Sequence, residues 1–335
     1  MYINNFDMKK SIVGVLCGGF SSEKEISFKS GYNVLNNLSE KLWDSYFIKF
    51  NNNKWYVEDK EEKKYNFFIN DFSFKKNDLK IKFDVIFNAI HGTPGENGQI
   101  ISFIELLNLP YTGSNSYSSA LTFNKRDCLS ILKNYGINSS KNYYLDQDQK
   151  INEDDIIKSV GLPCFVKANR SGSSFGIYKV YKKAELSISI KNAFKEDSQL
   201  IIEKALKGRE FSVGVYRLNN EIKVLPITEI ISENDFFDYS AKYEGKSEEI
   251  TPAKLDDKNI KKLNELSIRI FKILNLKGFT RSEFIIENNI PYLLDINTVP
   301  GLTKESIFPK QLLAANISLE SFFNNLLKEA LNKKT

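Results

Sequence analysis

The stretch SIVGVLCGGFSSEKEIS, residues 11–27, decides the fold class. Its apolar half, residues 11–17, predicts a buried strand that ends at a pair of glycines. Ser22 stands three residues before Glu25, which is the spacing of a capping box and predicts a helix reaching to about residue 38. A strand, a glycine turn and a helix N-terminus in this order are typical of an α/β sheet that binds ligands at the carboxyl end of its strands.

Composition limits the classes of protein that remain. A chain of 335 residues predicts two or three domains, and 41% hydrophobic with 27% charged residues is typical of a globular protein. The net charge of +5 is spread along the chain, so no nucleic-acid surface is predicted, although an anionic small molecule would suit it. No apolar run reaches the roughly 18 residues that span a bilayer, and the run at 12–16 is too short for a signal peptide, so we expect a cytoplasmic protein.

Cysteine and histidine usage excludes several kinds of site. The three cysteines are scattered, which predicts neither a disulfide framework nor a zinc site. His91 is the single histidine, so an HExxH metal site is excluded. His91 ends a predicted strand beside glycines, where it is either structural or a ligand contact. Glu23, in the first turn of its helix, either complements the helix dipole or faces a ligand amine.

The order of predicted elements divides the chain into three units, 1–115, 116–204 and 205–335. In the first, residues 46–80 are expected to form short surface strands without a site, and 81–90 a buried strand before the loop HGTPGENG at 91–98. In the second, a helix over 116–134 carries Lys125 and precedes a small α+β unit. The third contains strands at 210–217 and 221–230, a helix at about 258–275, a hairpin at 279–297 and two terminal helices.

Two loops have compositions that suit ligand binding. The loop NRSGSSFG, residues 169–176, lies between two predicted strands, and its backbone N–H groups could cradle phosphates or simply form a polar hairpin tip. Neither a P-loop nor a GxGxxG fingerprint is present. The stretch 232–253 is too long for a plain connector, and is either a lid over a reacting site or a surface loop.

The hairpin TRSEFIIENNIPYLLDIN, residues 280–297, carries polar side chains inside apolar strands. A three-residue loop at 288–290 would set Glu283 opposite Asp295, and Arg281 opposite Asn297, on one face. A two-residue loop would divide the carboxylates between the two faces. Facing carboxylates with an amide oxygen favour Mg²⁺ or Mn²⁺, but a solvated face with an Arg281–Glu283 ion pair is equally open. The opposite face is expected to build the core with Phe284, Ile286, Tyr292, Leu294 and Ile296.

Taken together, these stretches resemble the D-alanine–D-alanine ligases of the ATP-grasp superfamily over roughly residues 11–330. The stretches that carry the resemblance are GGFSSEKEIS, HGTPGENGQ with PYTGS, VKANRSGSSFG, EKALKGREFSV, DYSAKY and the segment 281–309. The resemblance implies a three-domain ATP-grasp fold of α/β and α+β class with an N-terminal Rossmann-like domain, the pre-ATP-grasp domain. It also implies that ATP and two D-alanines are converted through a D-alanyl phosphate to D-alanyl-D-alanine, for peptidoglycan precursor synthesis.

The resemblance assigns roles residue by residue. On the nucleotide it implies Lys125, Lys167 and the lid residue Lys242 for the phosphates, Ser173 and Ser174 in the covering loop, and Glu203, Lys204, Leu206 and Glu210 for adenine and ribose. It implies two Mg²⁺ or Mn²⁺ ions on Glu283, Asp295 and Asn297. On the amino-acid side it implies Glu23 with nearby His91 for the first D-alanine, Ser306 for the second, Arg281 and the Gly301 amide for the oxyanion, and a latch of Glu23, Ser173 and Tyr243.

Some features refine or weaken the resemblance. Lys242-Tyr243 favours an amine as second substrate over D-lactate. The family usually has Asp before Glu on the metal hairpin, and here Glu283 precedes Asp295, which puts metal affinity at risk. The alternatives are therefore a related ligase that takes D-lactate or D-serine, and a degenerate nucleotide-binding protein without activity. Family resemblance further implies a homodimer.

Overall fold

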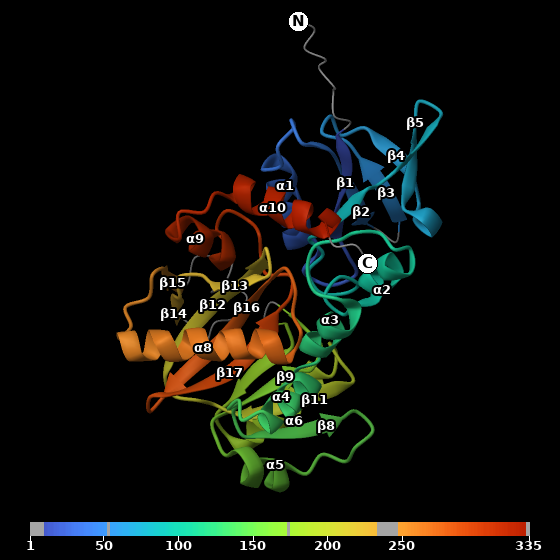
Figure 1. The fold of residues 1–335 in the computed structure, drawn as a ribbon. Helices are drawn as coiled ribbons and strands as arrows, with labels where there is room; N and C mark the ends of the chain where they lie inside the picture. Colours follow the sequence, from blue (N-terminus) through green and yellow to red (C-terminus); the bar gives the residue numbers. More distant parts are fainter. Residues whose placement is uncertain (1–9, 52–53, 173–174, 233–246, 333–335) are drawn as a thin grey trace, which may run out of the picture.

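The computed structural model describes residues 10–51, 54–172, 175–232 and 247–332. These residues form three β-sheets with helices packed around them (Figure 1). The α/β and α+β class predicted from the sequence is confirmed. No helix among the described residues is both long and apolar enough to cross a membrane.

The first sheet has the strand order β6-β5-β4-β3-β2-β1-β7. Its centre is parallel: β1 (Ser11–Gly18) pairs with β2 (Trp43–Asn51) on one side and β7 (Val85–Asn88) on the other. An antiparallel extension follows, made of β3 (Lys54–Glu58), β4 (Lys64–Phe68), β5 (Ser73–Lys76) and β6 (Leu79–Lys82), with a short 3-10 turn, η1 (Ile69–Asp71). The helices of this part are α1 (Lys24–Asn36) and α2 (Gln99–Leu106).

Three sequence predictions are wrong in this sheet. Residues 46–51 are not a surface strand, because they belong to β2, which is largely buried between β1 and β3. The single strand expected over 81–90 is two strands, and Asp84 between them accepts a hydrogen bond from the Ile12 N–H. The capping box does not form, since Glu23 is the N-cap of α1 and makes no side-chain cap, while the Ser21 hydroxyl accepts the Glu23 N–H.

The second sheet has the order β10-β9-β11-β8. Its strands are β8 (Asn142–Asp146), which the sequence analysis missed, β9 (Cys164–Ala168), β10 (Ile177–Val180) and β11 (Gln199–Lys204). Two helices, α5 (Glu153–Val160) and α6 (Lys183–Ala193), cover it. The helix expected over 116–134 is divided into α3 (Ser116–Phe123) and α4 (Lys125–Asn134), because Asn124 between them is extended and caps α4 through its side chain.

The third sheet has the order β15-β14-β12-β16-β17, with β13 on β12. The strands are β12 (Arg209–Leu218), β13 (Glu221–Val224), β14 (Thr228–Ser232), β15 (Ser247–Ile250), β16 (Phe279–Glu287) and β17 (Ile290–Asn297). The strand expected over 221–230 is thus two strands, β13 and β14. The helices of this part are α8 (Asp257–Ile273), α9 (Ile307–Ala314) and α10 (Leu319–Asn332).

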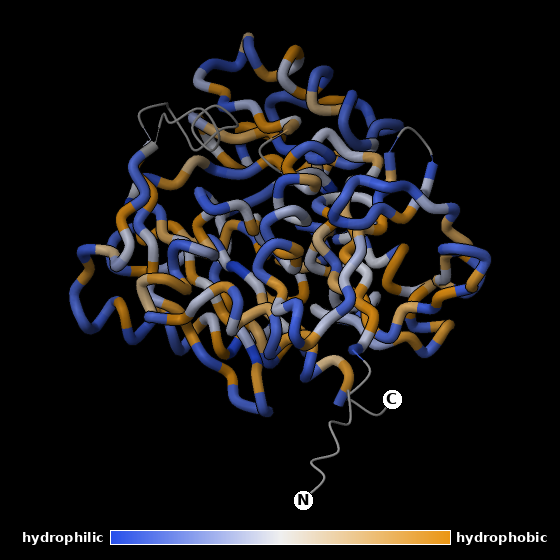
Figure 2. The backbone as a smooth tube through the Cα atoms, turned by 90° about the horizontal axis from the view of Figure 1, so that it is seen from above, coloured by the Kyte–Doolittle hydropathy of each residue, from blue (hydrophilic) through white to orange (hydrophobic). Residues whose placement is uncertain are grey.

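One aromatic cluster joins the beginning and the end of the chain. Phe87 of β7 contacts Phe279 of β16 and Phe323 of α10, and Phe308 of α9 packs on both Phe279 and Phe322. Accordingly α10 lies beside α1 in Figure 1, and hydrophilic turns lie at the outer edges of the chain in Figure 2. Each sheet falls inside one predicted unit, but this shared core crosses the boundaries, and the division into three domains stays a prediction.

Candidate active site

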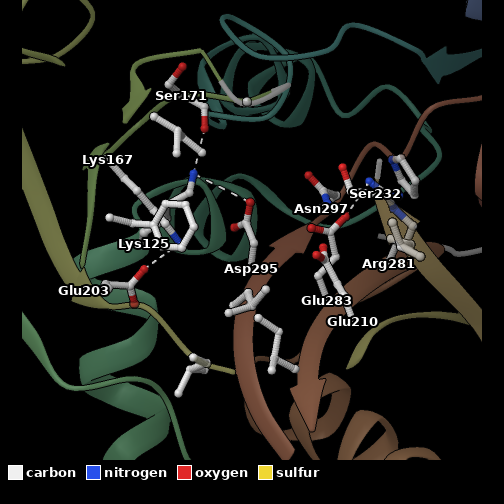
Figure 3. Close-up of a pocket in the computed structure, with 18 of the residues that line it drawn as sticks. Lys125, Lys167, Ser171, Glu203, Glu210, Ser232, Arg281, Glu283, Asp295 and Asn297 are labelled. Carbon is white, nitrogen blue, oxygen red and sulfur yellow. Dashed lines mark hydrogen bonds and ion pairs between the residues drawn. The ribbon is translucent and has the colours of Figure 1, made fainter. Parts of the chain in front are cut away.

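A cavity of about 550 Å³ is lined by residues of the second and third sheets and their loops, together with residues at the start of α1 and in the loop after β7 (Figure 3). It brings together most of the residues singled out in the sequence: Glu23, His91, Lys125, Lys167, Glu203, Lys204, Leu206, Glu210, Arg281, Glu283, Asp295, Asn297 and Gly301. Ser306 does not line it. Ser173, Ser174, Lys242 and Tyr243 lie outside the described residues.

Two lysines with little exposed surface enter the cavity from different elements. Lys125, the first residue of α4, donates to the Ser171 carbonyl oxygen at 2.6 Å and lies 3.6 Å from an Asp295 carboxylate oxygen. Lys167 of β9 pairs with Glu203 of β11, with 2.7 Å between Nζ and Oε2. Burial alone favours the neutral amine, but Glu203, with weaker contributions from Asp295 and Glu210, outweighs burial and raises the pKa of Lys167. Both cations can therefore meet an anionic ligand.

The carboxylate pair forms as predicted, but by another route. The turn has two residues, Asn288 and Asn289, both at positive φ, so Glu287 pairs with Ile290 and the predicted three-residue loop is wrong. A β-bulge then adds one residue to β17, after which Glu283 stands opposite Asp295. The same register sets Arg281 opposite Asn297. A two-residue turn alone would have divided the carboxylates, and the bulge restores them to one face.

The bulge also corrects the prediction for Leu294. Leu293 is completely buried in the core, whereas Leu294 lines the cavity next to Asp295. Strict alternation along the strand predicts Leu294 in the core, and the bulge turns it toward the cavity instead. Three further apolar residues of the cavity were not predicted, because no local pattern in the sequence marks them. They are Phe165, Ile177 and Ile285.

The hairpin offers oxygen ligands beside a cation. An Arg281 guanidinium nitrogen lies 3.0 Å from Oε1 of Glu283, which is buried and has no hydrogen bond of good geometry. The ion-pair alternative is thus present, and it leaves the facing Asp295 carboxylate and the Asn297 amide on the same side. In the described part of the chain, no three His, Cys, Asp or Glu side chains are grouped closely enough to hold a metal ion by themselves.

His91 is held through both ring nitrogens. Nδ1 lies 2.9 Å from the Val299 carbonyl oxygen and Nε2 lies 2.8 Å from the Ser30 hydroxyl. A carbonyl can only accept, so Nδ1 carries the proton and Nε2 of the neutral ring accepts from Ser30. Burial lowers the pKa of His91, and the nearby charge of Glu23 only partly opposes this effect. The net lowering keeps the ring neutral. Of the two alternatives for His91, the geometry favours the structural one.

Glu23 and Ser306 each lie behind a glycine. Glu23 is buried where α1 begins, and a Cβ on Gly172 would lie 2.4 Å from its carboxylate, so the backbone of the loop after β9 approaches it closely. The Ser306 hydroxyl lies 2.8 Å from that of Thr303 and accepts the Thr303 N–H. A Cβ on Gly301 would lie 2.7 Å from Ser306 Oγ.

Glu96 is a cavity residue that the sequence analysis missed. One of its carboxylate oxygens accepts the Gly92 N–H at 2.8 Å and the other accepts the Val299 N–H at 3.3 Å. Burial, with the nearby charge of Glu23, raises the pKa of Glu96 to about 8. An acidic residue inside the glycine loop HGTPGENG was the available signal.

The second and third sheets enclose the cavity between lysines and a carboxylate hairpin, and this arrangement is the ATP-grasp fold. Family models described as D-ala D-ala ligase N-terminus and C-terminus match residues 12–114 and 131–328. D-alanine–D-alanine ligases of Flavobacterium johnsoniae and Christiangramia forsetii are 52% and 46% identical, covering 95% and 98% of this chain and 99% and 100% of theirs. This chain belongs to the D-alanine–D-alanine ligase family.

Solved structures agree with this membership. D-alanyl-alanine synthetase A from Vibrio cholerae matches with a TM-score of 0.87 at 28% identity, covering 97% of this chain and 99% of that one. A D-Ala:D-Ser ligase from Enterococcus faecalis matches with a TM-score of 0.84, also at 28% identity, covering 96% of this chain and 100% of that one.

Proposed function

We propose that the 550 Å³ cavity is where this chain joins two D-alanines with ATP, the reaction that its membership of the D-alanine–D-alanine ligase family assigns to it. The observation that carries the proposal is the meeting, in one cavity, of Lys125 and Lys167 with the Glu283–Asp295 pair. The two lysine ammonium groups suit the oxygens of a triphosphate. The two carboxylates suit the metal ions that accompany a triphosphate.

The nucleotide would lie between the second and third sheets. Lys125 and Lys167 would bind its phosphates, since both are buried and already face oxygen atoms. Glu203, Lys204, Leu206 and Glu210 would surround base and ribose, against the apolar wall that includes Phe165 and Leu294. Lys242, Ser173 and Ser174, which lie outside the described residues, stay predicted phosphate contacts.

Glu283, Asp295 and Asn297 fit a Mg²⁺ or Mn²⁺ site shared with phosphates. All three donors are oxygens on one face, and Glu283 has an oxygen without a good hydrogen bond. They form only part of a coordination shell, which is usual where phosphates supply the remaining ligands. Two bound ions would neutralise the charge of the transferring phosphoryl group. The exchanged order of Glu283 and Asp295 keeps both carboxylates, so we expect activity with altered metal affinity.

The amino-acid chemistry would take place at the Glu23 end of the cavity. Glu23 would bind the ammonium group of the first D-alanine, whose carboxylate attacks the γ-phosphorus and releases ADP. The amine of the second D-alanine then attacks the acyl carbon, loses a proton, and expels phosphate. Arg281 and the Gly301 N–H would stabilise the negative oxygen of the tetrahedral intermediate. Ser306 would bind the carboxylate of the second substrate after turning from Thr303.

Several finer expectations remain predictions. They are the latch of Glu23, Ser173 and Tyr243, the homodimer and the cytoplasmic location. D-serine is a second candidate for the second substrate, because a D-Ala:D-Ser ligase has the same fold at a TM-score of 0.84. The Lys242-Tyr243 pair favours an amine substrate in either case and disfavours D-lactate.

The test is ADP release from the full chain with Mg²⁺ and ATP. The arms contain D-alanine, L-alanine, D-alanine with D-serine and D-alanine with D-lactate, and mass spectrometry identifies the product. We expect turnover with D-alanine and a D-alanyl-D-alanine product. ATP binding without D-alanine-dependent turnover, in Mg²⁺ and also in Mn²⁺, would support the degenerate alternative. A mixed D-alanine–D-serine product at equal substrate concentrations would support the second candidate.

A further inference from the structure

The loop that follows β17, residues 298–302, joins the metal hairpin to the segment before α9. Asn297 ends the strand on one side, and Gly301 lines the cavity four residues later. This loop belongs in sequence to the third unit, but its backbone is bound by side chains of the first unit. Those side chains come from α1 and from the loop after β7, more than 200 residues away in sequence.

Four side chains hold the two residues that flank Pro300-Gly301. At Val299, the carbonyl oxygen accepts from His91 at 2.9 Å and the N–H donates to Glu96 at 3.3 Å. At Leu302, the N–H donates to the Ser30 hydroxyl at 3.2 Å and the carbonyl oxygen accepts from Asn33 at 2.6 Å. The four side chains, which we call the backbone clamp, are Ser30, Asn33, His91 and Glu96.

Within residues 299–302, the clamp leaves one backbone donor uncommitted. Proline has no N–H, and the N–H groups of Val299 and Leu302 are occupied. In the described part of the chain, the Gly301 N–H makes no hydrogen bond within the protein, and Gly301 lines the cavity. The segment therefore presents its remaining donor where a ligand oxygen can reach it.

The members of the clamp are buried, and two of them, Ser30 and His91, are hydrogen-bonded to each other. Ser30 donates to His91 while it accepts from Leu302, so one hydroxyl connects both ends of the clamp. The exposed fraction of each clamp residue is 8% or less, which excludes water as a ready substitute partner. Leu302 is itself completely buried in the aromatic core shared with α10.

We propose that the backbone clamp positions the Gly301 N–H as an oxyanion donor, so that the first unit of the chain controls a catalytic group of the third. The inference rests on the proposed function, which places the tetrahedral intermediate beside Gly301. A donor that is fixed before reaction costs no reorganisation when charge develops, and this is why its placement matters. Ser30 and Asn33 are positioning residues, since neither lines the cavity.

The test compares Asn33→Leu with a matched control, Asn324→Leu. Asn324 of α10 is equally buried and also links the two ends of the chain, accepting from the indole of Trp43 at 2.6 Å. Its side-chain hydrogen bonds in the described part of the chain go to Ser39 and Trp43, and none goes to the 298–302 loop. Ser30→Ala tests the clamp a second time, and Ser30→Thr, which keeps a hydroxyl, should recover activity. The measurements on each full-length variant are the melting temperature, kcat, KM for ATP and affinity for a phosphinate dipeptide.

A phosphinate dipeptide mimics the tetrahedral intermediate, so its affinity reports the oxyanion donor without turnover. For Asn33→Leu and Ser30→Ala we expect kcat and phosphinate affinity to fall roughly 10- to 100-fold, with the ATP KM within about twofold of wild type. Asn324→Leu should lose thermal stability and keep kcat. Unchanged kcat in Asn33→Leu, or an equal loss in Asn324→Leu, would overturn the proposal. An inactive wild type would instead refute the proposed function, and the clamp proposal with it.

Discussion

Replacing Glu203 with glutamine removes the charge partner of a buried lysine. The Lys167 side chain is 13% exposed, the Glu203 side chain is 3% exposed, and their charged atoms lie 2.7 Å apart. Glutamine keeps the size of the side chain, so the change leaves an ammonium group that is buried and unpaired. Breaking such a pair from one side costs about 3–5 kcal/mol in the free energy of unfolding. Since the unfolding entropy of a 335-residue chain is about 0.7 kcal/mol/K, we expect Glu203→Gln to lower the melting temperature by roughly 4–7 °C.

The matched control is Glu229→Gln in the same cavity. Glu229 is as well buried as Glu203, but its partner Arg209 has a half-exposed side chain that water can solvate after the pair is lost. This loss should cost roughly 1 kcal/mol or less. Circular dichroism and calorimetry are the suitable readouts. Tryptophan fluorescence would report on the first sheet only, because Trp43 and Trp55, the two tryptophans, both lie there. Equal melting temperatures for the two variants would refute the reasoning.

The dependence of stability on pH separates the charge effect from packing. In the wild type the folded-state pKa of Lys167 lies above its ordinary value of about 10.5, so its contribution to stability is complete below that pH and is lost above it. In Glu203→Gln burial should lower that pKa, and the unfolded chain then binds more protons. Stability of the variant should therefore rise, relative to wild type, between pH 7 and 10. A deficit that does not change with pH would indicate a packing defect instead.

Three further outcomes follow from particular contacts. Leu294→Ala should raise the ATP KM several-fold with little loss of stability, because Leu294 lines the cavity. Leu293→Ala, at the buried neighbouring position, should lower the free energy of unfolding by about 2–5 kcal/mol and leave the ATP KM unchanged. Reversed effects of the two variants would contradict the bulge. Phe322→Ala, which removes ring contacts to Phe279 and Phe308, should cost about 3–5 kcal/mol by calorimetry, and a melting curve unchanged from wild type would argue against the shared core. The three cysteines are buried with raised pKa values of about 11 to 12, so iodoacetamide at pH 8 should label them only after unfolding in urea; labelling of the folded protein would show that they are accessible.

Much of the fold was predictable because its signals are local. The apolar run 11–17 followed by two glycines indicates a buried strand and a turn, whatever the rest of the chain does. The helix expected at about 258–275 was predicted within two residues, as α8 (Asp257–Ile273), for the same reason. Errors occurred where a partner far away in sequence decides the outcome. Residues 46–50 lie in an interior strand only because β1 pairs with residues 43–50.

The candidate site shows the same division. The residue types on the hairpin, with carboxylates and an amide among apolar residues, predicted its chemistry from sequence, whereas its turn was predicted with one residue too many. Only the three-dimensional pairing revealed the bulge that brings Glu283 and Asp295 together and turns Leu294 to the cavity. A three-residue turn without a bulge and a two-residue turn with a bulge give the same pairing at the end of the hairpin. Strand alternation alone cannot distinguish these two arrangements.

The sequence by itself determined the class of fold, the oxygen and ammonium groups of the site, and the family that they resemble. The tertiary structure decided how those groups are held: His91 binds a backbone carbonyl, Glu96 joins two loops, and the clamp fixes the segment around Gly301. These hydrogen bonds join residues separated by up to 272 positions. Local periodicity contains no information about such pairs, because their geometry exists only after the first and third sheets have packed around their common core.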